Sequence, residues 1–173
     1  MVSIQGTAAR SFYLEEVKQL QFHSKLHSMF DSQYFWACSP YKTDIIYESQ
    51  SNLNDFLINQ LFKMADKQFD AKTRKHFYTS EGSKNTLEAF FIRLYHFTQQ
   101  KDWYESFIVN FDAQARENPS NPITRHLLGC FRHIDLQNFR NLYDNDMPKR
   151  KLTVDRHQTY MLLTDYLSQF NKN

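Results

Sequence analysis

Residues 82–111, GSKNTLEAFFIRLYHFTQQKDWYESFIVNF, carry the clearest helical pattern in the chain. Large apolar side chains recur every three or four residues on both sides of a short polar break, and this spacing predicts two consecutive amphipathic helices. Asn85 with Glu88, and Asp102 with Glu105, resemble the residue pairs that cap the starts of helices. The stretch therefore favours an all-α fold.

The composition points the same way. The chain has 173 residues, of which 41% are hydrophobic, including 16 Phe and 10 Tyr, so it can bury a core and is not a disordered segment. It contains only 3 Gly. Turns in β-rich proteins and the phosphate loops of doubly wound domains need glycine, whereas helical bundles need little.

Apolar spacing predicts helices through most of the remaining chain. Residues 1–10 are expected to form a loose terminus, and helical spacing begins at Ser11. Further helices are predicted after the capping residue Asn52, over 71–79, and from Asn121 with Pro122 as the first helical residue. The residues expected on the buried faces are Tyr13, Val17, Leu20, Phe22, Leu26, Met29, Leu53, Leu57, Leu61 and Met64.

Residues 31–50 have a weaker pattern. The apolar stretch SQYFWACSP should end at Pro40, because proline restricts the residue before it and ends helices. The stretch YKTDIIYES that follows fits one or two turns of helix. The whole chain is thus predicted to form seven or eight helices with no strand.

The bulk properties predict a cytoplasmic protein. The formal net charge is +2, without the strong basic excess usual in nucleic-acid-binding proteins. Two cysteines cannot form a disulfide framework, and a reduced compartment is the simpler interpretation. We find neither a membrane-spanning apolar run nor a signal peptide, so no membrane partner is expected.

Candidate metal and catalytic residues do not form a convincing set. His23 and His27 lie one helical turn apart, but the glutamate of the zinc-protease motif is absent and no third ligand is indicated. His126, Cys130 and His133 share a helix face that spans two turns, which is too long for one ion. Neither a metal nor a cofactor is expected, and the chain is predicted not to be an enzyme.

Two basic clusters could contact phosphates or an acidic protein. They are KTRKH at 72–76 and KRK at 149–151. The second lies in a polar linker, where a solvated loop is the simpler interpretation.

The helices predicted over 82–111 resemble the fourth and fifth helices of a caspase activation and recruitment domain (CARD). They are most similar to those near the start of RIG-I-like and Dicer-related RNA helicases. The stretch DRHQTYMLLTDYLSQF at 155–170 is similar to the helix that opens the second such domain in those proteins. The resemblance implies a death-fold bundle in which Phe90, Phe91, Leu94, Trp103 and Phe107 are core residues.

The resemblance further implies a CARD-like bundle over 11–118 and additional helices over 119–173. These could form one enlarged domain or a compressed tandem pair. The expected function is protein–protein recruitment in antiviral or RNA-interference signalling, with the helicase activity outside this chain. The expected partner is a protein, such as another CARD-like domain, and direct RNA contact is not expected. Charged faces set partner choice in such modules, and the candidates are Lys72, Arg74, Lys75, Asp102 and Glu105.

Two alternatives remain open at this stage. The first is a helical domain that binds a ligand or nucleic acid, like the effector domain of a bacterial repressor, with a cavity near Tyr95, Phe97 and Trp103. The second is a small enzyme with a cleft that joins His126, Cys130 and a carboxylate.

Overall fold

Residues 34–47 form a β-hairpin, and this hairpin makes the fold mixed α/β. The structure, a computed structural model, describes residues 1–134. Strand β2 (Tyr34–Ser39) pairs with β3 (Lys42–Tyr47) across a turn at Pro40 and Tyr41. The prediction of an all-α, death-fold or CARD-like bundle is therefore wrong.

The hairpin belongs to a four-stranded antiparallel sheet of order β2-β3-β1-β4. Strand β1 (Val2–Gln5) lies inside the sheet between β3 and the two-residue strand β4 (Tyr78–Thr79). Residues 1–10 are thus not the loose terminus that we predicted. Val2 and Ile4 are almost completely buried, and the 3₁₀ helix η1 (Gly6–Phe12) follows directly.

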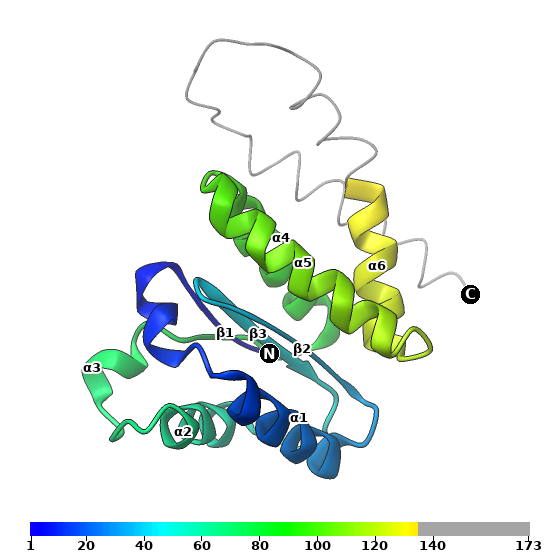
Figure 1. The fold of residues 1–173 in the computed structure, drawn as a ribbon. Coiled ribbons are helices and arrows are strands. Elements are labelled where there is room, and N and C mark those ends of the chain that lie inside the picture. The colour runs from blue at the N-terminus through cyan, green and yellow to red at the C-terminus, as the bar shows by residue number, and fades with distance from the viewer. Residues whose placement is uncertain (135–173) are drawn as a thin grey trace. The chain divides into compact units, whose positions relative to one another are not determined.

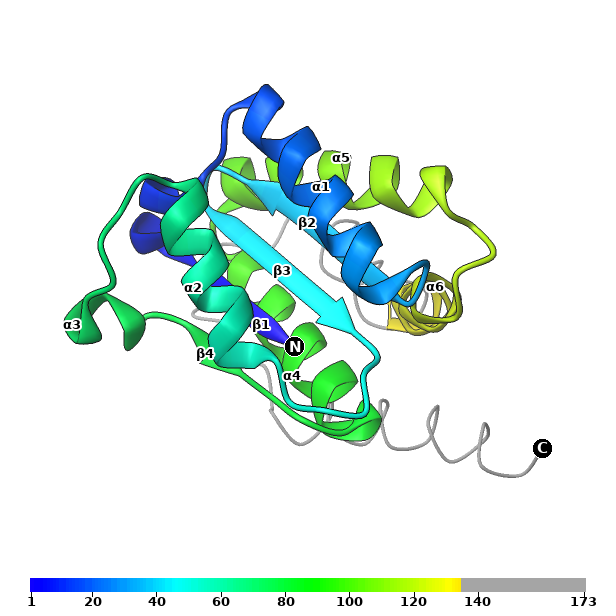
Figure 2. The same ribbon diagram turned by 90° about the horizontal axis from the view of Figure 1, so that it is seen from below.

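Helices cover both faces of the sheet (Figures 1 and 2). Helices α1 (Glu16–Phe30) and α2 (Asn54–Met64) pack on one face, and α4 (Ser83–Thr98) and α5 (Lys101–Glu117) pack on the other. The short helix α3 (Ala71–Arg74) connects α2 to β4. The result is three layers, with the sheet in the middle.

The face under α1 and α2 carries an apolar core. Because side chains alternate along a strand, the odd and even positions of β1, β2 and β3 point to opposite faces. The strand residues on the α1–α2 face are Val2, Ile4, Tyr34, Trp36, Cys38 and Ile45, and they pack with Phe22, Leu26, Phe30, Leu57, Ile58, Leu61 and Phe62 of the helices. Aromatic pairs such as Phe22 with Trp36, whose ring centres are 5.2 Å apart, add directional contacts.

Helix α1 buries only part of the apolar set that we predicted, because Phe22 and Leu26 are inside and Val17 and Leu20 are outside. Phe22, Leu26 and Phe30 are buried, whereas Val17 and Leu20 are 67% and 66% exposed. Tyr13 precedes the helix and is 44% exposed. The apolar spacing of this segment therefore describes two stripes, of which only one faces the core.

Several helices do lie where the sequence places them. Helices α2, α4 and α5 cover the predicted segments, and Asn121 caps α6 (Pro122–Ile134) by accepting from the backbone N–H of Ile123 at 2.8 Å. The predicted capping pairs are wrong, because α4 begins after Gly82 and α5 after Gln100.

Both edges of the sheet are protected against pairing with another strand. Every residue of β2 is buried, so its outer edge is covered, and β4 has only two residues. The chain forms two compact units, residues 1–124 and 125–173. The segment 155–170 and the KRK cluster lie outside the described residues.

Candidate functional site

The sheet face under α4 and α5 is polar at its centre. The strand register places Ser3 opposite Asp44 and Gln5 opposite Lys42, and the alternation of side chains directs all four toward the α4–α5 layer. Ser3, Lys42 and Asp44 are completely buried. A polar cluster therefore lies on a helix-covered face of the sheet, where side chains are normally apolar.

Lys42 and Asp44 form an ion pair inside this cluster. The Lys42 Nζ atom lies 3.0 Å from Asp44 Oδ2 and donates to Asp44 Oδ1 at 3.2 Å and to Gln5 Oε1 at 3.4 Å. Three aromatic rings of the helix layer surround the same ammonium group. Their centroids lie 5.3–5.9 Å from Nζ, and they belong to Phe90, Phe97 and Phe107.

Burial lowers the pKa of Lys42 below its usual value. The carboxylate of Asp44 acts in the opposite direction and Arg93 in the same direction as burial. A buried ammonium keeps its charge only when a close anion and ring faces offset the lost hydration. Asp44 and the phenylalanine rings provide these two interactions.

Arg93, on α4, connects the buried cluster to the surface. Its Nε donates to Ser3 Oγ at 3.1 Å, and its guanidinium carbon lies 4.9 Å from the ring centre of Tyr78. Burial lowers the pKa of Arg93, and Asp44 and Tyr78 partly oppose that effect. Arg93 is half-buried and Tyr78 is 40% exposed, so this end of the cluster reaches solvent.

The residues predicted as core lie in or beside the α4–α5 layer. Phe90, Phe91, Leu94 and Phe107 are at most 3% exposed. Trp103 is half-buried and stacks on Tyr41 of the hairpin turn, with the ring centres 4.3 Å apart and the planes at 7°. Arg10 lies over the same Tyr41 ring at 5.3 Å. Trp103 thus holds α5 against the hairpin.

Ring packing also occupies the region where a repressor-like cavity was considered. Phe97 is buried and contacts both Trp103 and Phe107, each with ring centres 6.2 Å apart. Tyr95 is half-buried, and its pKa is raised by burial.

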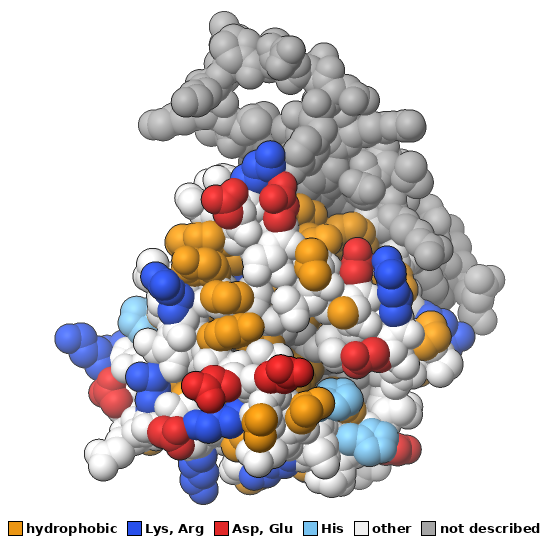
Figure 3. Space-filling model, viewed as in Figure 1, with side chains coloured by type: hydrophobic (Ala, Val, Ile, Leu, Met, Phe, Trp, Pro, Cys, Tyr) orange, Lys and Arg blue, Asp and Glu red, His pale blue; other side chains and the backbone are white. Residues whose placement is uncertain are grey.

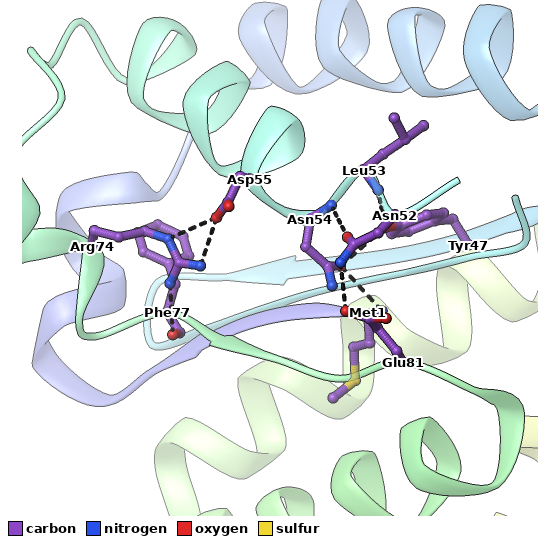
Figure 4. A network of polar contacts seen from close by, with 9 residues as sticks. All are labelled: Met1, Tyr47, Asn52, Leu53, Asn54, Asp55, Arg74, Phe77 and Glu81. Atoms are coloured by element: carbon purple, nitrogen blue, oxygen red, sulfur yellow. Dashed lines mark hydrogen bonds and ion pairs between the residues drawn. The ribbon is translucent and has the colours of Figure 1, made fainter. Parts of the chain in front are cut away.

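The charged residues predicted to bind a partner lie on separate elements. Lys72 and Lys75 are exposed at α3, and Asp102 and Glu105 are exposed on α5, where Glu105 lies 3.8 Å from Lys101. Arg74 differs from its neighbours, because its Nη2 pairs with Asp55 at 2.8 Å and its Nη1 donates to the Phe77 carbonyl at 3.3 Å (Figure 4). Its guanidinium therefore fastens α2 to the segment before β4.

Figure 4 shows a second polar network beside this ion pair. The Tyr47 hydroxyl donates to Asn54 Oδ1 at 3.0 Å and accepts from the Leu53 N–H at 2.9 Å. The amino group of Met1 donates to Asn54 Oδ1 at 3.5 Å and to the Ser80 carbonyl at 2.9 Å. These contacts fix the start of α2 against the sheet.

Of the predicted histidine and cysteine positions, His23 is half-buried and Cys130 is buried, whereas His27 and His126 are exposed. His23 packs against Tyr34 and Trp36, and His27 lies on the exposed side of α1. Burial raises the pKa of Cys130 to about 12, which keeps the thiol protonated at neutral pH. Within residues 1–134 no group of three potential ligands could hold a metal ion, and the side chain of His133 lies outside the description.

The polar cluster was not predicted from the sequence. The KTD and VSIQ segments do contain a signal, since polar side chains two residues apart share one face of a strand. That pattern ordinarily predicts a face toward solvent, and nothing local indicates that α4 and α5 cover it.

No protein-family model, curated protein or solved structure matches the chain. The helical bundle that the resemblance to CARD-containing RNA helicases implied is not the fold of residues 1–134, which is mixed α/β. Over residues 1–134, no helix is long and apolar enough to cross a membrane.

Proposed function

We propose that this chain is a non-catalytic protein-interaction module that binds a protein partner through the outer side of α1. The observation that carries the proposal is the pair Val17 and Leu20, which are 67% and 66% exposed. They lie three residues apart and therefore form one apolar stripe on the helix. Tyr13, 44% exposed, precedes them in the chain.

Exposure of this stripe distinguishes it from the other large apolar residues of α1. The opposite side of the helix packs into the core through Phe22, Leu26 and Phe30, so α1 cannot bury both stripes in this fold. Figure 3 shows hydrophobic side chains at the surface over α1 and α5, with acidic and basic side chains around them. Apolar surface rimmed by charge is typical of protein contact sites.

The described reactive groups favour binding over catalysis. Lys42 and Asp44 are completely buried by the α4–α5 layer, where a substrate would have to displace the helices. Burial raises the pKa of both cysteine thiols, Cys38 and Cys130, and disfavours the nucleophilic thiolate. Burial of these groups supports a role in the fold, and exposure of the α1 stripe supports a role in binding.

The experiment compares the wild type with Val17→Ser/Leu20→Ser in cross-linking capture from the native cell, followed by identification of the captured proteins. We expect the main captured protein to fall by about tenfold, because two apolar contacts of an interface are removed. Val109→Ser is the matched control, since Val109 on α5 is 69% exposed and has the same chemistry. Equal capture by all three proteins would contradict the proposal.

Charged residues are tested in the same assay. Exposed Lys72 and Lys75 on one side, and Asp102 and Glu105 on the other, remain the candidates for steering the partner. Replacing each pair by alanine should weaken capture most at low salt. If the lysine variant instead lost a salt-sensitive shift with double-stranded RNA, the basic pair would serve a nucleic acid rather than a protein.

A further inference from the structure

The buried cluster contains more positive than negative charge. Lys42 and Arg93 each carry a cation, and Asp44 is the carboxylate that interacts electrostatically with both of them. The shortest contact of Asp44 is to Lys42, at 3.0 Å. Arg93 therefore shares the carboxylate of Asp44 with Lys42, which is already paired with it.

Within residues 1–134, the guanidinium of Arg93 also has more N–H donors than hydrogen-bond acceptors. Arg93 donates through Nε to Ser3 Oγ at 3.1 Å, and no hydrogen bond within residues 1–134 uses its two terminal amino groups. A guanidinium has five N–H donors in a planar fork that matches the two oxygens of a carboxylate or a phosphate. Tyr78 lies against this fork at 4.9 Å and is 40% exposed.

We propose that Arg93 and Tyr78 form a binding site for a small oxyanion, a phosphate or a carboxylate, that balances the charge of the buried cluster. The anion lies on the solvent side of the guanidinium, where the terminal amino groups donate to two of its oxygens. The Tyr78 ring shields this contact from water on one side. The inference is independent of the proposed partner surface, because α1 packs on the other face of the sheet.

The site can be tested by NMR, through the side-chain Nε–Hε signal of Arg93 during titrations with sodium phosphate and with sodium acetate at constant ionic strength. The signal is assigned to Arg93 because it is absent from the spectrum of Arg93→Lys. We expect a saturable shift with at least one of the two anions, and the stronger one names the chemistry. Arg116 on α5 is exposed and serves as the control within the same spectrum, with no saturable shift.

Two variants separate the role of the guanidinium fork from that of charge alone. Arg93→Lys keeps the positive charge but loses the bidentate geometry. In this variant and in the wild type, binding is followed through the backbone amide signal of Tyr78, and saturation of the variant should need about tenfold more anion. Tyr78→Phe keeps the ring beside the guanidinium and should bind like the wild type. Thermal unfolding of each variant without anion shows whether the fold is intact.

Either of two results would overturn the proposal. One is a shift of Arg93 that rises linearly with both anions, like that of Arg116. The other is a neutral Lys42 amine at pH 7, measured by the ¹⁵N shift of Nζ, because Arg93 and Asp44 would then balance each other without a ligand.

Discussion

Both faces of the sheet pack against helices, but one contact is apolar and the other is polar at its centre. Under α1 and α2, Val2, Ile4 and Ile45 meet apolar helix side chains, and the layer is held by the burial of apolar surface. Under α4, Ser3 and Asp44 of the same strands lie in a polar cluster beneath phenylalanine rings. An apolar face accepts many side chains of similar size, whereas a buried ion pair is strongly destabilised when only one of its partners is removed. The comparison predicts that mutations on the two faces will behave differently.

The largest effect should come from Asp44→Ala. This change leaves the ammonium of Lys42 buried without its anion, and breaking a buried pair in this way costs about 3–5 kcal/mol of unfolding free energy. Chemical denaturation of the wild type and the variant measures the difference. A loss below about 1 kcal/mol would show that Lys42 is solvated or neutral, and the contrast between the faces would then disappear.

A smaller effect is expected for Ser3→Ala. The hydroxyl of Ser3 receives the Arg93 Nε–H at 3.1 Å, and its removal leaves a partly buried donor unsatisfied, at a cost of about 1–3 kcal/mol. Thr43→Val is the matched control on the α1–α2 face, where the hydroxyl lies 3.3 Å from Cys38 Sγ, a weak partner. Ser3→Ala should be the more destabilising of the two in the same denaturation experiment.

The polar face should also add a pH dependence. Burial lowers the pKa of Lys42, so between this lowered value and the usual lysine value the unfolded chain binds more protons than the folded one. Stability from this group therefore rises with pH in that window, by at most about 1.4 kcal/mol per pH unit. Unfolding of the wild type and Lys42→Met across this range isolates the contribution. A difference that does not change with pH would contradict the assignment.

The smallest loss of stability is expected when both charges are removed together. Lys42→Met/Asp44→Leu replaces the pair with apolar side chains of similar volume, and such exchanges are often neutral or stabilising by about 1–4 kcal/mol. The double variant should thus be far more stable than Asp44→Ala. If it were equally destabilised, the polar face would depend on shape rather than on charge pairing.

Sequence patterns could predict the parts of this fold whose helical period is strong. The segments of α2, α4 and α5 carry apolar residues at helical spacing, and Asn121 with Pro122 marks the start of α6. The hairpin was not predicted, for three physical reasons. Strand β2 is buried on both faces and reads as an apolar run, β3 hides its charges under helices, and the turn uses Pro40 and Tyr41 rather than glycine.

The candidate site was harder to predict than the fold. Ser3 and Arg93 are 90 residues apart in sequence, and they meet only because α4 packs on β1. No local pattern joins them, and alternating polar residues along a strand ordinarily indicate a face toward solvent rather than toward a helix layer. The apolar spacing of α1 includes the exposed pair Val17 and Leu20, but the sequence alone did not show which apolar residues of this helix would be buried.

The two tryptophans of the chain offer an optical view of these layers. Trp36 lies in the α1–α2 layer beside Phe22, and Trp103 stacks flat on Tyr41 in the other layer. Each indole therefore samples one side of the sheet, and its emission reports solvent entry on that side. Replacing either indole with phenylalanine leaves a single fluorophore per molecule. Two such proteins would reveal whether the layers melt together, as one cooperative unit, or one after the other.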